Sequence, residues 1–242
     1  MRGTRVVVLT GAGVSAESGI RTFRDHDGLW ENHRIEDVAT PYAWRDDPVL
    51  VWRFYQARRR QLNEVAPNPA HEALAELANG LGNMVLITQN VDDLHERGGS
   101  ADVIHMHGQL EMLRCEVSGQ HERRMDETDL EDEFLTCRCC AEPGRLRPDI
   151  VWFGEVPMHM ERIHAAMEVC EVFIVVGSSG HVYPAADLVH VAKANGARTV
   201  LVNAEAPLNV EAFDEVHLGK AGELLPGLVK TWLNEDLSLI HI

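Results

Sequence analysis

Short apolar runs alternate with longer amphipathic segments along this sequence of 242 residues. The runs with the length and β-branched content of buried strands are 6–10, 84–88, 103–106, 172–176 and 199–202, with weaker ones at 150–153 and 216–218. Apolar positions at helical spacing predict helices over 48–65, 70–81, 160–169, 185–194 and 222–233. Strands that alternate with helices predict an α/β fold built on a Rossmann-like, doubly wound parallel sheet.

Two segments interrupt this alternation. Residues 31–78 are mainly helical, and residues 112–147 lack a long period but hold a cluster of cysteines and an acidic run. We therefore predict a Rossmann-like domain, an inserted helical module and a small Cys-containing module of the zinc-ribbon type. Their bounds are 1–30, 79–111 and 148–242 for the first, 31–78 for the second and 112–147 for the third.

Polar or Gly-rich residues follow the predicted strands. They are 11–13, 89–92, 107–108, 177–179 and 203–205. In doubly wound sheets the ligand lies beyond the carboxyl ends of the strands. Because these five segments converge on one rim, we expect the rim to be a ligand site.

The first segment carries the pattern Gly11-x-Gly13-x-x-Ala16. It suits a tight turn, a close approach of pyrophosphate to the backbone, and a phosphate at the N-terminus of the next helix. A tight strand-to-helix turn that binds nothing is the alternative. The acidic residue that usually follows about 20 residues later is absent, since residues 21–32 are polar and show no strand.

Charge and cysteine usage narrow the function. A formal charge of −16 argues against a non-specific nucleic-acid or anionic-membrane binder. No apolar run approaches the roughly 18 residues of a membrane span, and the run at 6–10 is too short for a signal peptide. Four of the five cysteines lie between 115 and 140, as in a metal site rather than a disulfide framework. We expect a cytoplasmic protein. The sequence leaves the oligomeric state open and is compatible with a monomer.

The cysteine cluster departs from a regular zinc site. Such a site has two Cys-x-x-Cys pairs. The second pair is Cys137 and Cys140, whereas the first has Cys115 followed by Ser118. The fourth ligand is then Cys139 or His121, or the metal is weakly held or absent.

Three residues on the rim could do chemistry. An imidazole such as His107 can remove a proton from a hydroxyl near neutral pH, although a lone histidine is more often structural. His105 lies deeper in the same strand and is expected to be structural. Asn90 and Asp92 can face a cofactor together, or cap a helix.

A longer string over residues 11–24, Gly-Ala-Gly-x-Ser-x-x-Ser-Gly-Ile-x-x-Phe-Arg, resembles the cofactor-binding signature of the sirtuins. These are NAD-consuming protein-lysine deacylases. Further matches are Val151-Trp152-Phe153-Gly154-Glu155 and Gly180-His181-Val182-Tyr183-Pro184. The resemblance extends from Gly11 to the last strand.

This resemblance implies roles for residues. His107 is the general base, and Gln89, Asn90 and Asp92 bind the nicotinamide and its ribose, Asn90 and Asp92 also being catalytic. Phe23 shields the reactive ribose from water. Further NAD-binding positions are Gly11, Ala12, Gly13, Ser15, Glu17, Thr22, Arg24, Gly177, Ser178, Ser179, Asn203, Glu205 and Ala221. The peptide substrate pairs as a strand beside Val151, Phe153, Gly154 and Glu155. The zinc is structural.

Tyr55 and Arg58 are the candidates for recognition of the acyl group, and they share one face of the predicted helix 48–65. A basic surface helix would explain the same residues. Tyr-x-x-Arg resembles the sirtuin branch that removes succinyl and malonyl groups, and a guanidinium with a phenol suits a buried carboxylate.

The resemblance implies that the acyl oxygen attacks the nicotinamide ribose and expels nicotinamide. His107 then deprotonates a ribose hydroxyl that attacks the imidate, and water yields lysine and O-acyl-ADP-ribose. We therefore predict an NAD-dependent deacylase of acetyl and succinyl lysines in proteins, with malonyl as a further candidate. The alternatives are an NAD-linked oxidoreductase with structural zinc and a non-catalytic NAD-sensing adaptor.

Overall fold

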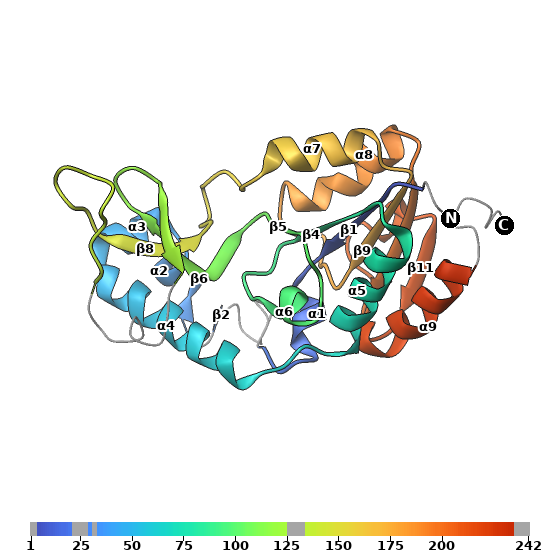
Figure 1. Cartoon of the computed structure of the whole chain (residues 1–242), viewed down its shortest axis with the longest axis horizontal. Helices are drawn as coiled ribbons and strands as arrows, with labels where there is room; N and C mark the ends of the chain where they lie inside the picture. Colours follow the sequence, from blue (N-terminus) through green and yellow to red (C-terminus); the bar gives the residue numbers. More distant parts are fainter. Residues whose placement is uncertain (1–3, 21–28, 31–32, 125–133, 235–242) are drawn as a thin grey trace.

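The computed structural model describes residues 4–20, 29–30, 33–124 and 134–234. Its main sheet has six parallel strands in the order β11-β10-β9-β1-β4-β5 (Figure 1). The strands are β1 (Val6–Thr10), β4 (Met84–Thr88), β5 (Val103–His105), β9 (Val172–Val176), β10 (Arg198–Asn203) and β11 (Glu215–Leu218). The strands that follow β1 in the chain, β4 and β5, lie on one side of it, and the later strands β9, β10 and β11 lie on the other. The strand order therefore reverses between β1 and β9. The predicted doubly wound parallel sheet is confirmed.

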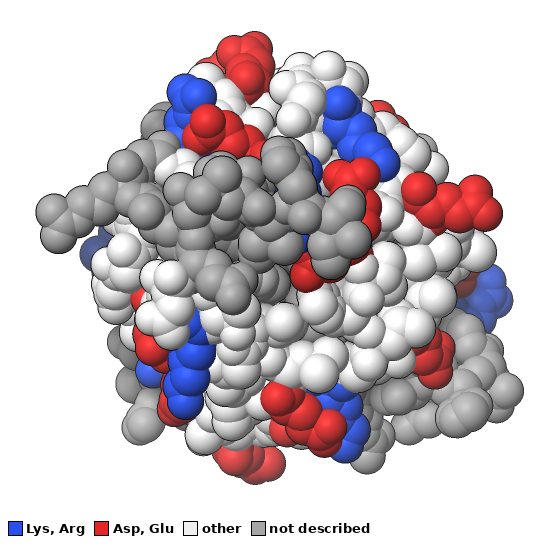
Figure 2. All heavy atoms as spheres, turned by 90° about the vertical axis from the view of Figure 1, so that its right-hand side faces the viewer, with Lys and Arg blue, Asp and Glu red and all other residues white. Residues whose placement is uncertain are grey.

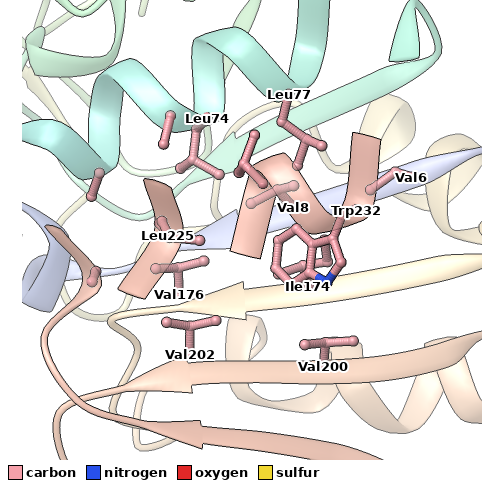
Figure 3. Packing of buried hydrophobic residues seen from close by; sticks show 14 of the residues in the cluster. Val6, Val8, Leu74, Leu77, Ile174, Val176, Val200, Val202, Leu225 and Trp232 are labelled. Atoms are coloured by element: carbon pink, nitrogen blue, oxygen red, sulfur yellow. The ribbon is translucent and has the colours of Figure 1, made fainter. Parts of the chain in front are cut away.

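Helices cover both faces of this sheet, which explains why β1 is apolar from Val6 to Leu9 and fully buried. Val6 and Val8 point to a core shared with α1 (Ala12–Ala16), α5 (Pro69–Leu81) and α9 (Ala221–Asn234), as Figure 3 shows for the last two helices. Val7 and Leu9 point to the opposite face, where α7 (Met160–Glu168) and α8 (Leu188–Ala194) pack. The alternation places the carboxyl end of β1 between two rigid layers.

One buried side chain ties α5 to the rim. Asn68 caps this helix by accepting a hydrogen bond from the Ala70 N–H (2.9 Å), while its own N–H donates to His71 Nδ1 (3.2 Å). Its amide nitrogen also donates to the Val14 carbonyl (2.8 Å) and to Ser18 Oγ (2.9 Å). The helix start and the turn after β1 are therefore held together.

A second lobe lies beside the main sheet (Figure 1). Its helices are α2 (Ile35–Val38), α3 (Pro41–Asp46) and α4 (Pro48–Glu64), and its antiparallel sheet has the order β7-β6-β8. These strands are β6 (Gly108–Cys115), β7 (His121–Arg124) and β8 (Leu146–Ile150). The remaining short elements are β2 (Leu29–Trp30), β3 (His33–Arg34), α6 (Leu94–Arg97), η2 (Ala185–Asp187) and η3 (Val210–Ala212). Trp44, Trp52 and Tyr55 from the helices share one hydrophobic core with Cys115 and Trp152. The two predicted insertions thus pack against each other.

One predicted strand is absent, and two features of the packing were not indicated by the sequence. The segment 150–153 is not a strand: β8 ends at Ile150, and the chain then turns, with the Glu155 N–H donating to the Trp152 carbonyl (2.9 Å). The small antiparallel sheet itself had no periodic signal because β6 and β8 lie about 30 residues apart and pair irregularly. In addition, α5 packs on the main sheet although residues 69–78 fall within the predicted helical module; that module's bounds remain a prediction.

The surface carries charges of both signs. On the end of the main-sheet domain that Figure 2 shows, the Lys and Arg side chains of the described residues lie interspersed with Asp and Glu and form no continuous basic patch among them. Among the described residues, no helix combines the length and the apolar character needed to cross a membrane.

Candidate active site

The loops after β1 and β9 touch at the point where the strand order reverses. The Gly11 N–H donates to the Val176 carbonyl and the Gly13 N–H to the Gly177 carbonyl, both at 2.9 Å. A Cβ on Gly13 would lie 2.8 Å from the Gly177 oxygen, and Gly177 itself has a φ of +63°. Glycine is therefore required on both sides of this contact. The crevice edge predicted to hold pyrophosphate is a rigid, side-chain-free junction of backbone groups.

Three predicted cofactor residues meet next to this junction. The Asn90 amide nitrogen donates to Ser15 Oγ (2.9 Å), and the Asp92 carboxyl group is hydrogen-bonded to Ser15 as well. All three side chains are buried. Burial raises the pKa of Asp92, against the hydrogen bond from Ser15. Asp92 also accepts from the Leu94 N–H (3.2 Å) at the start of α6, so the helix-capping interpretation applies to it too.

A second set of polar groups links the ends of β4, β9 and β10. The Gln89 amide nitrogen donates to Ser178 Oγ (3.0 Å). The Asn203 amide nitrogen donates to the Ser178 carbonyl (3.1 Å) and to the Glu205 carbonyl (2.8 Å). The Glu205 side chain is exposed. The predicted rim segments are thus joined into one continuous edge, next to which lies the half-buried Ser179.

One predicted cofactor residue, Ala221, begins α9, and another, Glu17 at the end of α1, contacts this helix start. The Glu17 carboxylate accepts from the Gly222 N–H (3.0 Å), where the helix dipole favours negative charge. Ala221, one residue earlier, is buried. Ala12 is exposed at the start of α1. Thr22, Phe23 and Arg24 lie outside the described residues.

His107 is held in the protonation state that a general base needs. Its Nδ1 lies 3.0 Å from the Gln89 carbonyl, which can only accept, so Nδ1 carries the hydrogen and Nε2 keeps its lone pair. Burial lowers the pKa of His107, which keeps the ring neutral at pH 7. Gly108 follows with a φ of +84°, and a Cβ there would lie 1.9 Å from the Asp149 carbonyl oxygen. That close backbone contact fixes the position of His107.

His105 is engaged at both ring nitrogens. Nε2 lies 2.7 Å from a Glu96 carboxylate oxygen, and Nδ1 lies 3.3 Å from the Asn90 carbonyl. The side chain is 5% exposed. It therefore holds α6 and the segment after β4 in place, the structural role expected of the deeper histidine.

Tyr55 and Arg58 lie on the inner side of α4. Tyr55 is buried, and its hydroxyl accepts a hydrogen bond from Trp152 Nε1 (3.0 Å). Burial raises the pKa of Tyr55, so it stays a neutral hydroxyl. Arg58 is half-buried, with its guanidinium carbon 5.5 Å from the centroid of the Phe54 ring. A purely solvent-facing basic helix does not describe this side of α4.

The segment after β8 connects this region with His107. The Val151 N–H donates to the His107 carbonyl (2.9 Å), and the Phe153 N–H donates to the Ala39 carbonyl (3.0 Å). Phe153 is 47% exposed, and Gly154 turns the chain with a φ of +93°. These residues, predicted to pair with a peptide, lie at an accessible edge beside the candidate base.

Glu155 is bound within the protein. Its carboxylate pairs with Arg147 through two contacts of 2.8 and 2.9 Å, with Arg114 at 3.3 Å, and accepts from the Trp152 N–H at 2.9 Å. These partners lower the pKa of Glu155 against the effect of burial. The carboxylate holds the turn in shape.

Four cysteine sulfurs converge at the far end of the second lobe. Those of Cys115, Cys137, Cys139 and Cys140 all lie within 4.8 Å of one another. Two Sγ–Sγ distances are 3.8 Å (Cys115 to Cys140) and 3.7 Å (Cys139 to Cys140). A tetrahedral zinc with Zn–S bonds of about 2.3 Å requires S–S edges of about 3.8 Å. The four thiols therefore fit a structural zinc ion.

The contacts of Cys139 and His121 favour Cys139 as the candidate for the fourth ligand. Cys139 Sγ belongs to the sulfur cluster and lies 3.2 Å from Ser118 Oγ, where the incomplete pair lacks its cysteine. His121 Nδ1 lies 2.7 Å from an Asp149 oxygen instead. Burial opposes ionisation of Cys115, but hydrogen bonds from Ser118 prevail and lower its pKa to about 6. A low thiol pKa favours the thiolate that zinc binds.

Sequence reasoning did not single out Trp152 as a functional residue. It lies within the matched segment 151–155, and an indole next to predicted substrate residues was the available signal. Cys139 was one of two open alternatives, and only the sulfur positions choose it.

Known proteins resemble this chain over almost its whole length. The model of the Sir2 family matches residues 11–184. A Yersinia pseudotuberculosis serotype I (strain IP32953) protein named NAD-dependent protein deacylase is 56% identical over 232 residues, 94% of this chain and 82% of that protein. A solved Sir2 homologue–NAD complex is 41% identical with a TM-score of 0.84, covering 94% of this chain and 88% of that one. A Sir2–p53 peptide–NAD⁺ complex is 28% identical with a TM-score of 0.80, covering 96% and 94%.

Proposed function

Because this chain belongs to the Sir2 family, we propose that it is an NAD-dependent protein-lysine deacylase that removes acetyl and succinyl groups, with malonyl as a further candidate. The products are nicotinamide, free lysine and O-acyl-ADP-ribose. The observation that carries the proposal is the state of His107. Its Nε2 is a neutral base, and Gln89, which orients the ring, donates its N–H to the Thr10 carbonyl (3.0 Å) next to the glycine junction that suits a dinucleotide.

The chain's own residues divide the work. Gly11 and Gly13 let the pyrophosphate of NAD approach the backbone at the crevice edge. Asn90 and Asp92, held through Ser15, bind the nicotinamide and its ribose. NAD supplies the electrophilic ribose carbon. His107 Nε2 takes the proton of a ribose hydroxyl, and the burial that keeps it neutral makes it ready at pH 7.

The acyl specificity follows from desolvation. Moving a succinyl carboxylate out of water costs on the order of several kcal/mol unless charged hydrogen bonds replace its hydration. Arg58 supplies N–H donors and Tyr55 an O–H donor on one helix face. Acetyl-lysine has no carboxylate and gains nothing from either group.

Protein partners follow from the same site. A bound peptide in the Sir2–p53 complex is a property of that relative, and we extend it to this chain as an acylated lysine in an extended segment beside Phe153 and Gly154. The zinc holds the second lobe together and takes no part in the chemistry. A cytoplasmic location remains a prediction from the clustered cysteines.

Nicotinamide release with one peptide carrying either acetyl- or succinyl-lysine tests the proposal. Arg58→Met should raise the succinyl KM about tenfold, as loss of a charged hydrogen bond of ~1.5–3 kcal/mol implies, and change the acetyl KM much less. Equal losses on both peptides would assign Arg58 to the fold. Formation of NADH instead of nicotinamide would point to an oxidoreductase, and binding of NAD without turnover to an adaptor.

A further inference from the structure

Trp152 donates a hydrogen bond to the Tyr55 hydroxyl. Its Nε1 lies 3.0 Å from the Tyr55 oxygen, and both side chains are buried. The two residues are 97 positions apart in the chain, on α4 and on the turn after β8. Their rings lie 6.4 Å apart at an angle of 36°, so the contact is through the polar edges rather than by stacking.

The direction of this bond is fixed by chemistry. An indole nitrogen only donates, so the Tyr55 oxygen accepts, and its own hydrogen must point away from Trp152. The raised pKa of Tyr55 keeps that hydrogen in place at every working pH. A phenol in this arrangement can donate its hydrogen to a carboxylate, which only accepts.

The indole cannot easily turn away. The Arg147 guanidinium carbon lies 3.4 Å from the centroid of the Trp152 ring, and Arg147 is in turn held by the Glu155 carboxylate through two contacts. The same carboxylate accepts from the Trp152 backbone N–H (2.9 Å). A cation on the ring face also draws electron density from the indole, which strengthens Nε1–H as a donor.

The same turn is tied to the candidate base. Val151, the residue before Trp152, donates its N–H to the His107 carbonyl (2.9 Å). The segment 151–152 thus contacts both Tyr55 and His107 and fixes one relative to the other. An acyl group must span the distance between these two residues, with its carboxylate at Tyr55 and its reacting carbonyl near His107.

We infer that Trp152 is a positioning residue for acyl recognition: it orients the Tyr55 hydroxyl as a donor toward the carboxylate of a dicarboxylic acyl-lysine. The inference rests on the proposed acyl role of Tyr55 and Arg58. Without the indole N–H, the phenol can rotate its hydrogen toward other acceptors, and the pre-set donor is lost. The loss affects succinyl-lysine and not acetyl-lysine.

Trp152→Phe removes the N–H and keeps an aromatic ring. The ratio of kcat/KM for succinyl- to acetyl-lysine peptide should fall about fivefold, the usual effect of losing one neutral hydrogen bond. Trp44→Phe is the matched control. Trp44 belongs to the same hydrophobic core, its ring lies 5.8 Å from that of Trp152, and its Nε1 donates to Glu116 (2.8 Å) rather than to Tyr55. It should leave the ratio unchanged even if both activities decline.

Tyr55→Phe separates this inference from the proposed function. It should lower the same ratio, and adding Trp152→Phe to it should lower the ratio no further, because the indole then has no hydroxyl to orient. A normal ratio in Tyr55→Phe would remove the acyl role of Tyr55 and the inference with it. A lowered ratio in Tyr55→Phe with a normal one in Trp152→Phe would overturn the inference alone.

The wild-type protein offers a measurement that does not depend on the stability of a variant. In ¹⁵N-labelled protein with ADP-ribose, the Trp152 Nε1–H resonance should shift on addition of succinyl-lysine peptide, while the Trp44 resonance stays in place. Tyr55→Phe identifies the Trp152 signal, since that substitution removes its acceptor. An equal shift with acetyl-lysine peptide, or no shift with either peptide, would overturn the assignment.

Discussion

Gly13→Ala tests whether the junction between the β1 and β9 loops governs cofactor binding. The added Cβ would lie 2.8 Å from the Gly177 carbonyl oxygen and 2.9 Å from its Cα, whereas ordinary contacts begin at 3.4 Å. Both neighbours are backbone atoms, so one loop must move by roughly half an ångström or more. Overpacking of this kind costs about 1–3 kcal/mol. The Gly13 N–H, which now donates to the Gly177 carbonyl, would move with it.

Gly227→Ala is the matched control. Gly227 lies within α9, and a Cβ there meets no atom within 4 Å. Replacing a helical glycine with alanine at an open position should stabilise the protein by about 0.5–1 kcal/mol. The two variants carry the same chemical change, so their difference isolates the crowding at the loop junction.

Urea unfolding and calorimetric titration with ADP-ribose measure the two effects. We expect Gly13→Ala to lower the free energy of unfolding by about 1–3 kcal/mol and to weaken ADP-ribose binding about tenfold or more, because the backbone donors of the crevice edge are displaced. A Gly13→Ala protein with unchanged stability and unchanged affinity would refute the view that this junction forms the phosphate site.

Three further predictions concern the base, the metal and acid stability. His107→Ala should reduce deacylation at least ~10²-fold while NAD binding persists, and the acid limb of the wild-type kcat/KM profile should lie below the ordinary histidine pKa of about 6.5; near-normal turnover of the variant would remove His107 from the mechanism. About one equivalent of zinc should co-purify with the protein, and Cys139→Ser should lose zinc and lower Tm whereas His121→Gln should keep it; the reverse pattern would reassign the fourth ligand. Burial lowers the pKa of His71 to about 4 and that of His95 to about 3, below the unfolded value of 6.5. Between these values the unfolded chain binds more protons than the folded one, so the protein becomes less stable as the pH falls. Lowering the pH from 7 to 5 should reduce the free energy of unfolding in urea by about 2 kcal/mol for each histidine, and a flat profile would contradict this.

Local patterns in the sequence determined the main sheet and the position of its ligand edge. The run at residues 6–10 became β1 and the run at 84–88 became β4, because strands buried on both faces are apolar along most of their length. Each of the two ends in a buried threonine, and the hydroxyls of Thr10 and Thr88 hydrogen-bond to each other (2.8 Å). The polar segments after these strands met at one rim because all six strands of that sheet are parallel. Each of these properties can be read from a few consecutive residues.

The second lobe depended on tertiary structure. Its strands β6 and β8 are separated by about 30 residues and pair with a register shift, so no sequence period marks them. The cysteine that completes the sulfur cluster, the bond between Trp152 and Tyr55, and the seating of α5 on the main sheet all join segments far apart in the chain. A short-range sequence pattern indicates which faces of a helix or strand are apolar. Only tertiary packing determines which apolar faces contact each other and which buried polar groups form hydrogen bonds between them.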